Sequence, residues 1–141
     1  NLAQRLPEML NKLNENDIVI LSRYVNGAKD LRSQKRVLSS RFINFICRIF
    51  LTNKIKDFTS GIFLMKRKVL LSAVPIAIGH GEFFVEFIYK AHLAGHKIIE
   101  LPYIHPPDEE GMSKTASSIF RFCYLGFGYF IRIIQSLLGR N

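Results

Sequence analysis

The sequence predicts a layered α/β fold, in which helices alternate with strands. Residues 18–21 form a short continuous apolar run, which is typical of a strand buried on both faces. This run follows residues 2–14, where apolar side chains recur at helical spacing. Two further helical segments, 35–51 and 82–94, alternate with strand-like runs at 62–65 and 97–104. Such alternation is characteristic of a layered α/β domain.

Turn and helix-termination signals between these segments support the predicted boundaries. Asn26-Gly27 is a turn signal after the first strand. Residues 69–74 have the pattern of a short helix that ends at Pro75. The helix at 82–94 carries acidic residues in its first turns and is followed by Gly95 at the C′ position. With 48% apolar residues in 141, the chain has enough material for one hydrophobic core.

The segment 35–51 is apolar on more than one face, which indicates either burial or contact with an apolar surface outside the domain. The last segment, 117–138, is a long apolar helix that contains Arg121 and Arg132. We place a helix lying in a membrane interface first and a buried globular helix second. A spanning helix comes third, because each arginine costs about 2.5–3.5 kcal/mol at the bilayer centre.

The excess of positive over negative charge lies entirely in the first half of the chain. Residues 1–70 contain 14 lysines and arginines against 5 acidic residues, whereas residues 71–141 contain 6 of each, so the net charge of +9 belongs to residues 1–70. It is densest in residues 22–48, where Asp30 is the only acid. A basic loop between a strand and a helix suits a phosphate group, and the alternative is a solvated basic face.

Three classes of partner fit this charge: nucleic acid, anionic lipid, or a phosphorylated small molecule. Nucleic acid is disfavoured, because the aromatic residues gather in the apolar helices and do not interleave with the basic ones. The two cysteines, Cys47 and Cys123, have neither a CxxC nor a Cys/His metal-binding spacing and are expected to be buried thiols in a reducing compartment. The four histidines do not form a metal-binding pattern, and His105 is the one worth testing.

Six short motifs then occur in order along the chain. They are Ser22-Arg23-Tyr24 with Asn26-Gly27, Lys35-Arg36 with Ser39-Ser40 and Asn44, Asp57-x-Thr59-Ser60-Gly61, Phe84-x-Glu86, Glu100-x-Pro102, and Gly111-x-Ser113-Lys114-Thr115. This succession resembles the C-terminal half of the catalytic domain of polyprenyl-phosphate glycosyltransferases, the dolichol-phosphate mannosyltransferase-like members of glycosyltransferase family 2. The resemblance covers nearly the whole chain.

The resemblance implies a GT-A fold, which is a Rossmann-like α/β domain, over residues 1–115, with an amphipathic or juxtamembrane helix over residues 116–141. The implied reaction is the inverting transfer of a hexose from a nucleotide sugar, UDP- or GDP-linked, to a polyprenyl phosphate. It further implies association with the cytoplasmic face of a membrane and a Mg²⁺ or Mn²⁺ ion held by an acidic DxD motif. That motif would precede residue 1, so we expect this chain to be the acceptor-side half of the enzyme, with the flank of strand 18–21 exposed.

The resemblance also assigns roles to individual residues. Phosphate binding would fall to Arg23, to Arg36 with Ser40, and to Ser113 with Lys114, and both Arg36 and Asp57 would act in catalysis. Asp57 would face the sugar or brace the pocket, although a turn or cap is an equal alternative for this residue and for Thr59. Glu86 is expected either to pair with a pocket arginine or to lie at the surface. The remaining basic residues of the stretch are expected to face water or lipid headgroups: Lys29, Arg32, Arg41 and Arg48.

One position departs from the family pattern. The family usually has an arginine three residues before the glycine of its GxSK motif, and here that position is Asp108, followed by two glutamates. An acidic triplet beside a phosphate pocket would repel the acceptor unless the loop turns it outward. The donor type therefore stays open, and a non-catalytic basic module that binds membrane surfaces is the alternative function.

Overall fold

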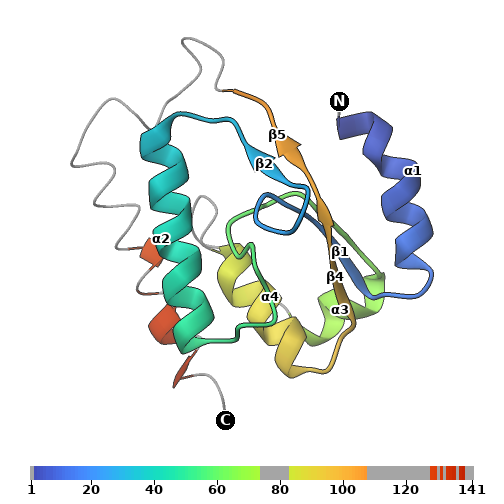
Figure 1. Cartoon of the computed structure of the whole chain (residues 1–141). Helices are drawn as coiled ribbons and strands as arrows, with labels where there is room; N and C mark the ends of the chain where they lie inside the picture. The colour runs from blue at the N-terminus through green and yellow to red at the C-terminus, as the bar shows by residue number, and fades with distance from the viewer. Residues whose placement is uncertain are drawn as a thin grey trace.

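A computed structural model describes residues 2–73, 83–107, 128–129, 131, 133–135 and 137–138. In chain order the elements are α1 (Leu2–Leu13), β1 (Ile18–Ser22), β2 (Lys29–Asp30), α2 (Gln34–Phe50), β3 (Phe63–Met65), α3 (Arg67–Ser72), α4 (Phe83–Leu93), β4 (Ile98–Pro102) and β5 (Ile104–His105). Figure 1 shows this mixed arrangement of helices and small sheets. The predicted α/β class is confirmed, and the helices and strands predicted within the described residues occur in the predicted order. The short strand β2 was not predicted, and residues 117–127 of the predicted last helix lie outside the described residues.

The main sheet has three strands in the order β3-β1-β4. β1 runs parallel to β4, with Ile18 opposite Ile98 and Ser22 opposite Pro102, and antiparallel to β3, with Ile18 opposite Met65. The expectation that the flank of residues 18–21 is exposed is therefore wrong. β1 is the central strand, and both of its edges are hydrogen bonded to strands that come later in the sequence.

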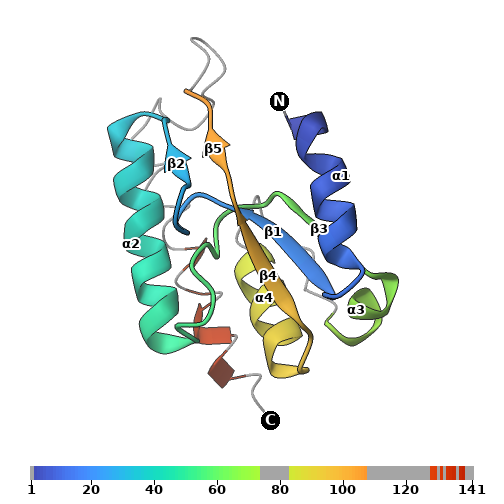
Figure 2. The same cartoon turned by 45° about the vertical axis from the view of Figure 1, so that its right-hand side comes forward.

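The two faces of β1 contribute to two different hydrophobic clusters. Ile18 and Ile20 pack in one cluster with residues of α2 and α4, such as Cys47 and Phe84. Val19 and Leu21 pack in the other, together with Met9 of α1. Because neighbouring side chains of a strand point to opposite faces, a run of four apolar residues fills both layers. Figure 2 shows α1 on one side of the sheet and α4 on the other.

The predicted strand at 97–104 is divided into two short strands. After β4 the chain continues into β5, which leaves the main sheet and pairs in parallel with β2. In that pairing Asp30 lies opposite His105. The small β2–β5 sheet therefore holds the basic loop after β1 against the segment that follows β4.

Glycines with positive φ mark two of the predicted chain reversals. Gly95, with φ +80°, follows α4 as predicted, and Gly27, with φ +82°, lies in the turn after β1. Only glycine adopts this left-handed region without steric cost. The predicted stop at Pro75 lies outside the described residues.

The described positions between 128 and 138 are helical. Ile133 is only 4% exposed and joins the α4-side cluster, and Tyr129 and Leu137, one turn before and after it, pack against the same cluster. Ile131, Ile134 and Leu138 are exposed. These positions therefore pack one face on the core and leave another apolar face uncovered. In the part of the chain that the structure describes, no helix is long and apolar enough to cross a membrane.

Candidate functional site

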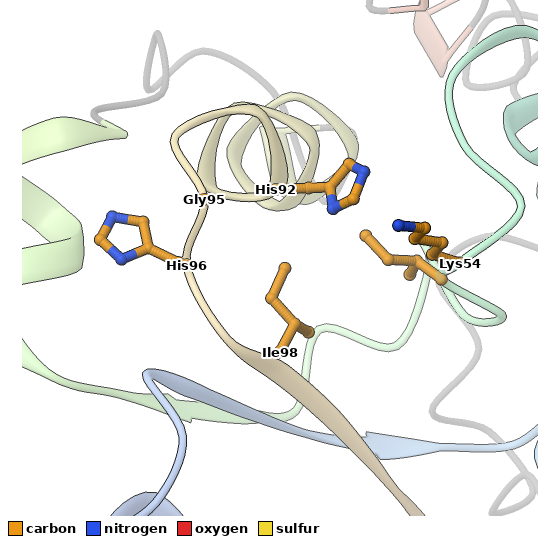
Figure 3. Close-up of a pocket in the computed structure, with 6 residues that line it drawn as sticks. Lys54, His92, Gly95, His96 and Ile98 are labelled. Carbon is orange, nitrogen blue, oxygen red and sulfur yellow. The ribbon is translucent and has the colours of Figure 1, made fainter.

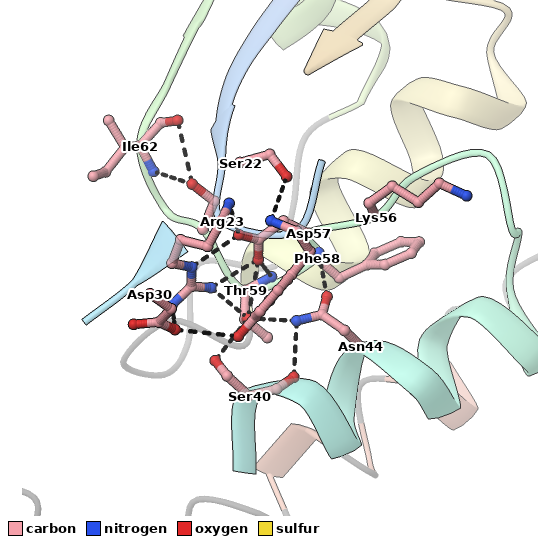
Figure 4. A network of polar contacts seen from close by, with 12 residues as sticks. Ser22, Arg23, Asp30, Ser40, Asn44, Lys56, Asp57, Phe58, Thr59 and Ile62 are labelled. Carbon is pink, nitrogen blue, oxygen red and sulfur yellow. Dashed lines mark hydrogen bonds and ion pairs between the residues drawn. The ribbon is translucent and has the colours of Figure 1, made fainter. Parts of the chain in front are cut away.

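A buried ion pair stands at the carboxyl end of β1. Arg23 follows the last residue of the strand, and its guanidinium donates two hydrogen bonds to Asp57, from Nε to Oδ2 at 2.8 Å and from Nη2 to Oδ1 at 2.7 Å. The backbone N–H of Arg23 donates a third bond to Oδ2 at 3.0 Å. The side chains of Arg23 and Asp57 are 3% and 0% exposed. The carboxylate thus fixes both the backbone and the side chain of Arg23 (Figure 4).

Thr59 connects this ion pair to α2. Its hydroxyl oxygen accepts hydrogen bonds from Nη2 of Arg23 at 2.7 Å and from Nδ2 of Asn44 at 2.9 Å. It also lies 3.1 Å from the hydroxyl of Ser40. Asn44 accepts the backbone N–H of Phe58 at 2.6 Å through its own side-chain oxygen. Ser40 and Asn44 are one turn apart on α2, so a single face of that helix holds the loop from residue 57 to residue 59.

A second carboxylate, Asp30, lies between two arginines. It accepts two hydrogen bonds from Arg32, from Nε at 2.8 Å and from Nη2 at 2.6 Å, and Nη1 of Arg23 lies 3.9 Å from it. Nη2 of Arg32 also donates to the hydroxyl of Ser40 at 3.2 Å. The expectation that Arg32 faces water is wrong, because its side chain is only 10% exposed. Asp30, three residues beyond the turn at Gly27, draws it inward.

These contacts close into a ring of polar side chains. Going around it, the members are Arg23, Asp57, Thr59, Ser40, Arg32 and Asp30. Two arginines and two aspartates alternate, so the ring as a whole carries no net charge. Burial alone would raise the pKa of Asp30, but the hydrogen bonds and charge of Arg32 outweigh it and lower this pKa to about 2. Burial works against the charge of Arg23, and its bonds to Asp57 nevertheless raise the pKa of the guanidinium.

Glu100 anchors the loop that contains Asp57. From β4, its carboxylate accepts the backbone N–H groups of Lys56 at 2.8 Å and Asp57 at 2.9 Å. Burial raises the pKa of Glu100, and the two N–H donors act in the opposite direction. The motif Glu100-x-Pro102 therefore has a structural explanation: the glutamate fixes the backbone of the residue that holds Arg23.

The structure brings together four of the predicted site residues. Arg23, Ser40 and Asp57 belong to the ring, and Arg36 lies half-buried on α2, one turn before Ser40. Asp57 braces Arg23, which corresponds to one of the two roles expected for it. Ser113 and Lys114 lie outside the described residues, as does Asp108. Of the basic residues expected to face water, Lys29, Arg41 and Arg48 are exposed.

Sequence reasoning missed the parts played by Asp30 and Arg32. The signal available was their spacing: an aspartate two residues before an arginine, in a stretch with no other acid. Glu86, expected at a pocket arginine or at the surface, is buried and forms an ion pair with Lys90 at 2.7 Å. The surface alternative is therefore wrong.

An open pocket of about 430 Å³ lies at the other end of the sheet, where β4 begins. It is lined by Lys54, Ile55, His92, Gly95, His96 and Ile98. Figure 3 shows the ring of His92 turned toward Lys54 and the ring of His96 turned away from it. Burial, and then the charge of Lys54, lower the pKa of His92. The nearest polar partner of His96 is the hydroxyl of Ser72, at 2.6 Å.

Metal binding has no candidate centre in the described ranges. Within residues 2–73, 83–107 and the described positions near the C-terminus, no three histidine, cysteine or acidic side chains gather closely enough to hold a metal ion. The Mg²⁺ or Mn²⁺ ion implied by the resemblance stays a prediction.

A scan against models of known protein families and a search of curated proteins both give no match to this chain.

Proposed function

We propose that this chain is the acceptor-side half of a GT-A glycosyltransferase domain, which transfers a hexose from a UDP- or GDP-sugar to a polyprenyl phosphate at a membrane surface. The observation that carries the proposal is the fixed arginine at the carboxyl end of β1, which Thr59 links to Ser40 of α2, with Arg36 one turn before Ser40. Ligands of open α/β sheets bind outside the carboxyl ends of the strands. The ordered motifs of the sequence add the substrate class.

The arrangement suits a phosphate nucleophile. A phosphate monoester has a second pKa near 6, so it is mostly dianionic at neutral pH and needs little help from a general base. It does need to be held in line with the sugar by donors that do not move. Arg36 and Ser40 bind its oxygens from one helix face, and Asp57 keeps Arg23 in place beside them.

The chemical step then balances without a further reactant. A phosphate oxygen of the acceptor attacks the anomeric carbon, a new carbon–oxygen bond forms, and the bond to the nucleoside diphosphate breaks with inversion at that carbon. The leaving diphosphate carries the negative charge away, and a bound divalent cation would supply the counter-charge for it. In this step the described residues bind and orient the acceptor.

α2 also offers a surface that fits a membrane. Opposite its buried face, which holds Ser40 and Asn44, a stripe of large apolar side chains is 57–66% exposed: Leu38, Phe42, Phe45, Ile49 and Phe50. Arg41 and Arg48 are exposed on the same helix. An apolar stripe flanked by cations is the pattern of a helix that lies in a lipid interface. A lipid-linked phosphate would thus meet its site from the membrane side.

Sugar transfer to a short polyprenyl phosphate tests the proposal. The natural full-length protein is incubated with UDP-glucose or GDP-mannose, Mg²⁺ or Mn²⁺, and farnesyl phosphate, and the lipid-linked sugar is quantified. Arg36→Ala and Lys114→Ala are each expected to lower kcat/KM for farnesyl phosphate at least about tenfold, because each removes a charged hydrogen bond. The matched control Arg41→Ala, on the outer face of α2, is expected to stay within about twofold in detergent solution. Unchanged transfer by both pocket variants would show that the pocket is misplaced.

The apolar stripe also favours a second candidate function, a non-catalytic module that binds anionic membranes. Co-sedimentation with vesicles of phosphatidylcholine and phosphatidylglycerol separates the two. For a module held by charge and apolar contact alone, the bound fraction would fall steeply with added salt and would not change when polyprenyl phosphate is included in the vesicles. Salt-resistant binding that requires polyprenyl phosphate would favour the transferase.

A further inference from the structure

We propose that Arg32, held in place by Asp30, is a further phosphate-binding residue of the acceptor site. This inference rests on the proposed function and adds a residue that none of the sequence motifs contains. It starts from the position of Arg32, which the structure brings from the basic loop into the polar ring beside Ser40.

The guanidinium of Arg32 is oriented on one edge only. Asp30 binds Nε and Nη2 in a two-pronged pair, and Ser40 takes a second bond from Nη2. A guanidinium has five N–H donors in a fixed plane, and the two on Nη1 point away from the paired edge. Among the described residues, Nη1 of Arg32 has no hydrogen-bond partner. The side chain thus combines a fixed direction with donors that remain for a ligand.

The location of these donors matches the acceptor site. Arg32 donates to the hydroxyl of Ser40 from the loop, and Arg36 lies one turn before Ser40 on α2. The backbone of the same loop is tied to β5, because the N–H of Leu31 donates to the carbonyl of His105 at 3.1 Å. The loop that carries Arg32 is therefore fixed beside Ser40, a predicted phosphate-binding residue.

Burial distinguishes Arg32 from the other cations of the loop. Its side chain is 10% exposed, enough for contact with a bound group but with little freedom to move, whereas Lys29 and Arg41 are exposed. Ordering an exposed arginine on a ligand costs side-chain conformational entropy. Asp30 has already ordered Arg32, so its contact with phosphate would avoid most of this cost.

The test compares acceptor binding with donor use in the natural full-length protein. Binding of farnesyl phosphate, and separately of inorganic phosphate, is measured by calorimetry, and KM values are measured for farnesyl phosphate and for the nucleotide sugar. Arg32→Lys keeps the charge but loses the planar fork, and Arg32→Ala removes both. Both variants are expected to weaken farnesyl phosphate binding and to raise its KM about tenfold, while the KM of the nucleotide sugar stays within about twofold. Arg67→Ala, which changes an exposed arginine of α3 outside the polar ring and the α2 surface, is the control, with both KM values within about twofold.

A purely structural role for Arg32 makes a different prediction. Arg32→Ala leaves Asp30 buried without its main partner, and the variant could lose binding through misfolding. The paired variant Asp30→Asn with Arg32→Gln avoids this, because it removes both charges and keeps side chains that can hydrogen bond. A structural role predicts that the pair restores normal binding, whereas a ligand role predicts binding about tenfold weaker.

The outcomes are distinguishable from failure of the proposed function. If the unchanged protein neither binds farnesyl phosphate nor transfers sugar to it, both proposals fall. If the unchanged protein does both, and the paired variant matches it, only the role of Arg32 in phosphate binding is refuted, whatever Arg32→Ala does. Weakened binding of farnesyl phosphate and of inorganic phosphate together would confirm that Arg32 binds the headgroup.

Discussion

Removing the carboxylate of Asp57 tests how much the fold depends on the ion pair at the end of β1. In Asp57→Ala the guanidinium of Arg23, whose side chain is 3% exposed, would stay buried without its counter-charge. Breaking such a pair from one side costs about 3–5 kcal/mol. The backbone N–H groups of Arg23 and Thr59 also lose their acceptor. A domain of this size is stable by about 5–15 kcal/mol, so the loss is a large part of the total.

Urea and thermal unfolding, followed by far-UV circular dichroism, measure this loss. At about 2–4 °C per kcal/mol, Asp57→Ala should lower Tm by roughly 6–20 °C. The control is Glu8→Ala, which breaks the exposed pair between Arg5 and Glu8 on α1, a pair of the kind that contributes about 0.5 kcal/mol or less. A double variant, Arg23→Met with Asp57→Leu, should recover much of the stability, because no charge is then buried alone. If Asp57→Ala unfolds within about 1 kcal/mol of the unchanged protein, the buried pair does not hold the loop and the reasoning fails.

Three further predictions concern other parts of the fold. Glu100→Ala should lower the free energy of unfolding, measured in urea, by about 1–3 kcal/mol, because the N–H groups of Lys56 and Asp57 lose their acceptor. Glu100→Gln keeps an acceptor oxygen and should lower it less, and equal losses for the two variants would contradict this explanation. Burial raises the pKa of Cys47 to about 12. In a Cys123→Ser variant, where Cys47 is the remaining thiol, iodoacetamide should therefore leave the folded protein unlabelled at pH 8 and label it in urea. The pKa of Asp17 is lowered to about 2, chiefly by its hydrogen bond from Lys68, and that of Asp30 is about 2 as well. A carboxylate whose pKa is lowered in the folded protein stabilises the fold fully above the pKa it has in the unfolded chain, near 4, and loses this contribution as the pH falls toward 2. Tm should therefore fall between pH 4 and pH 2, and Lys68→Ala should make this fall smaller, because it removes the hydrogen bond that lowers the pKa of Asp17.

Much of the fold was predictable from local patterns. The apolar run at residues 18–21 predicted a buried strand, because side chains on both faces of that strand would be apolar. In the structure this strand lies between two hydrophobic clusters. Gly95 predicted the end of α4 because its conformation requires glycine. These signals are local, since each depends only on neighbouring residues.

The polar ring depends on contacts between distant residues, and these could be predicted only in part. Arg23 and Asp57 are 34 positions apart, and nothing in their neighbourhoods says that they meet. The motifs selected Arg23, Ser40 and Asp57 individually, but their spacing could not show that Asp57 holds Arg23. Arg32 was misassigned for the opposite reason: the residue that draws it inward, Asp30, lies two positions away, and its effect depends on a loop whose shape is set by β5.

The central position of β1 has a consequence for how this chain tolerates insertions and deletions. A deletion of one residue within 18–22 would exchange the sides of the strand, so that side chains now packed against α1 would turn toward α4. Ile18 and Ile20 would exchange places with Val19 and Leu21, and the residue at the strand end would turn to the opposite face. Arg23 would then point away from Asp57. Changes of length should therefore be tolerated in the exposed turn around Gly27 much better than inside β1, where a single missing residue would disrupt both hydrophobic clusters and the polar ring at once.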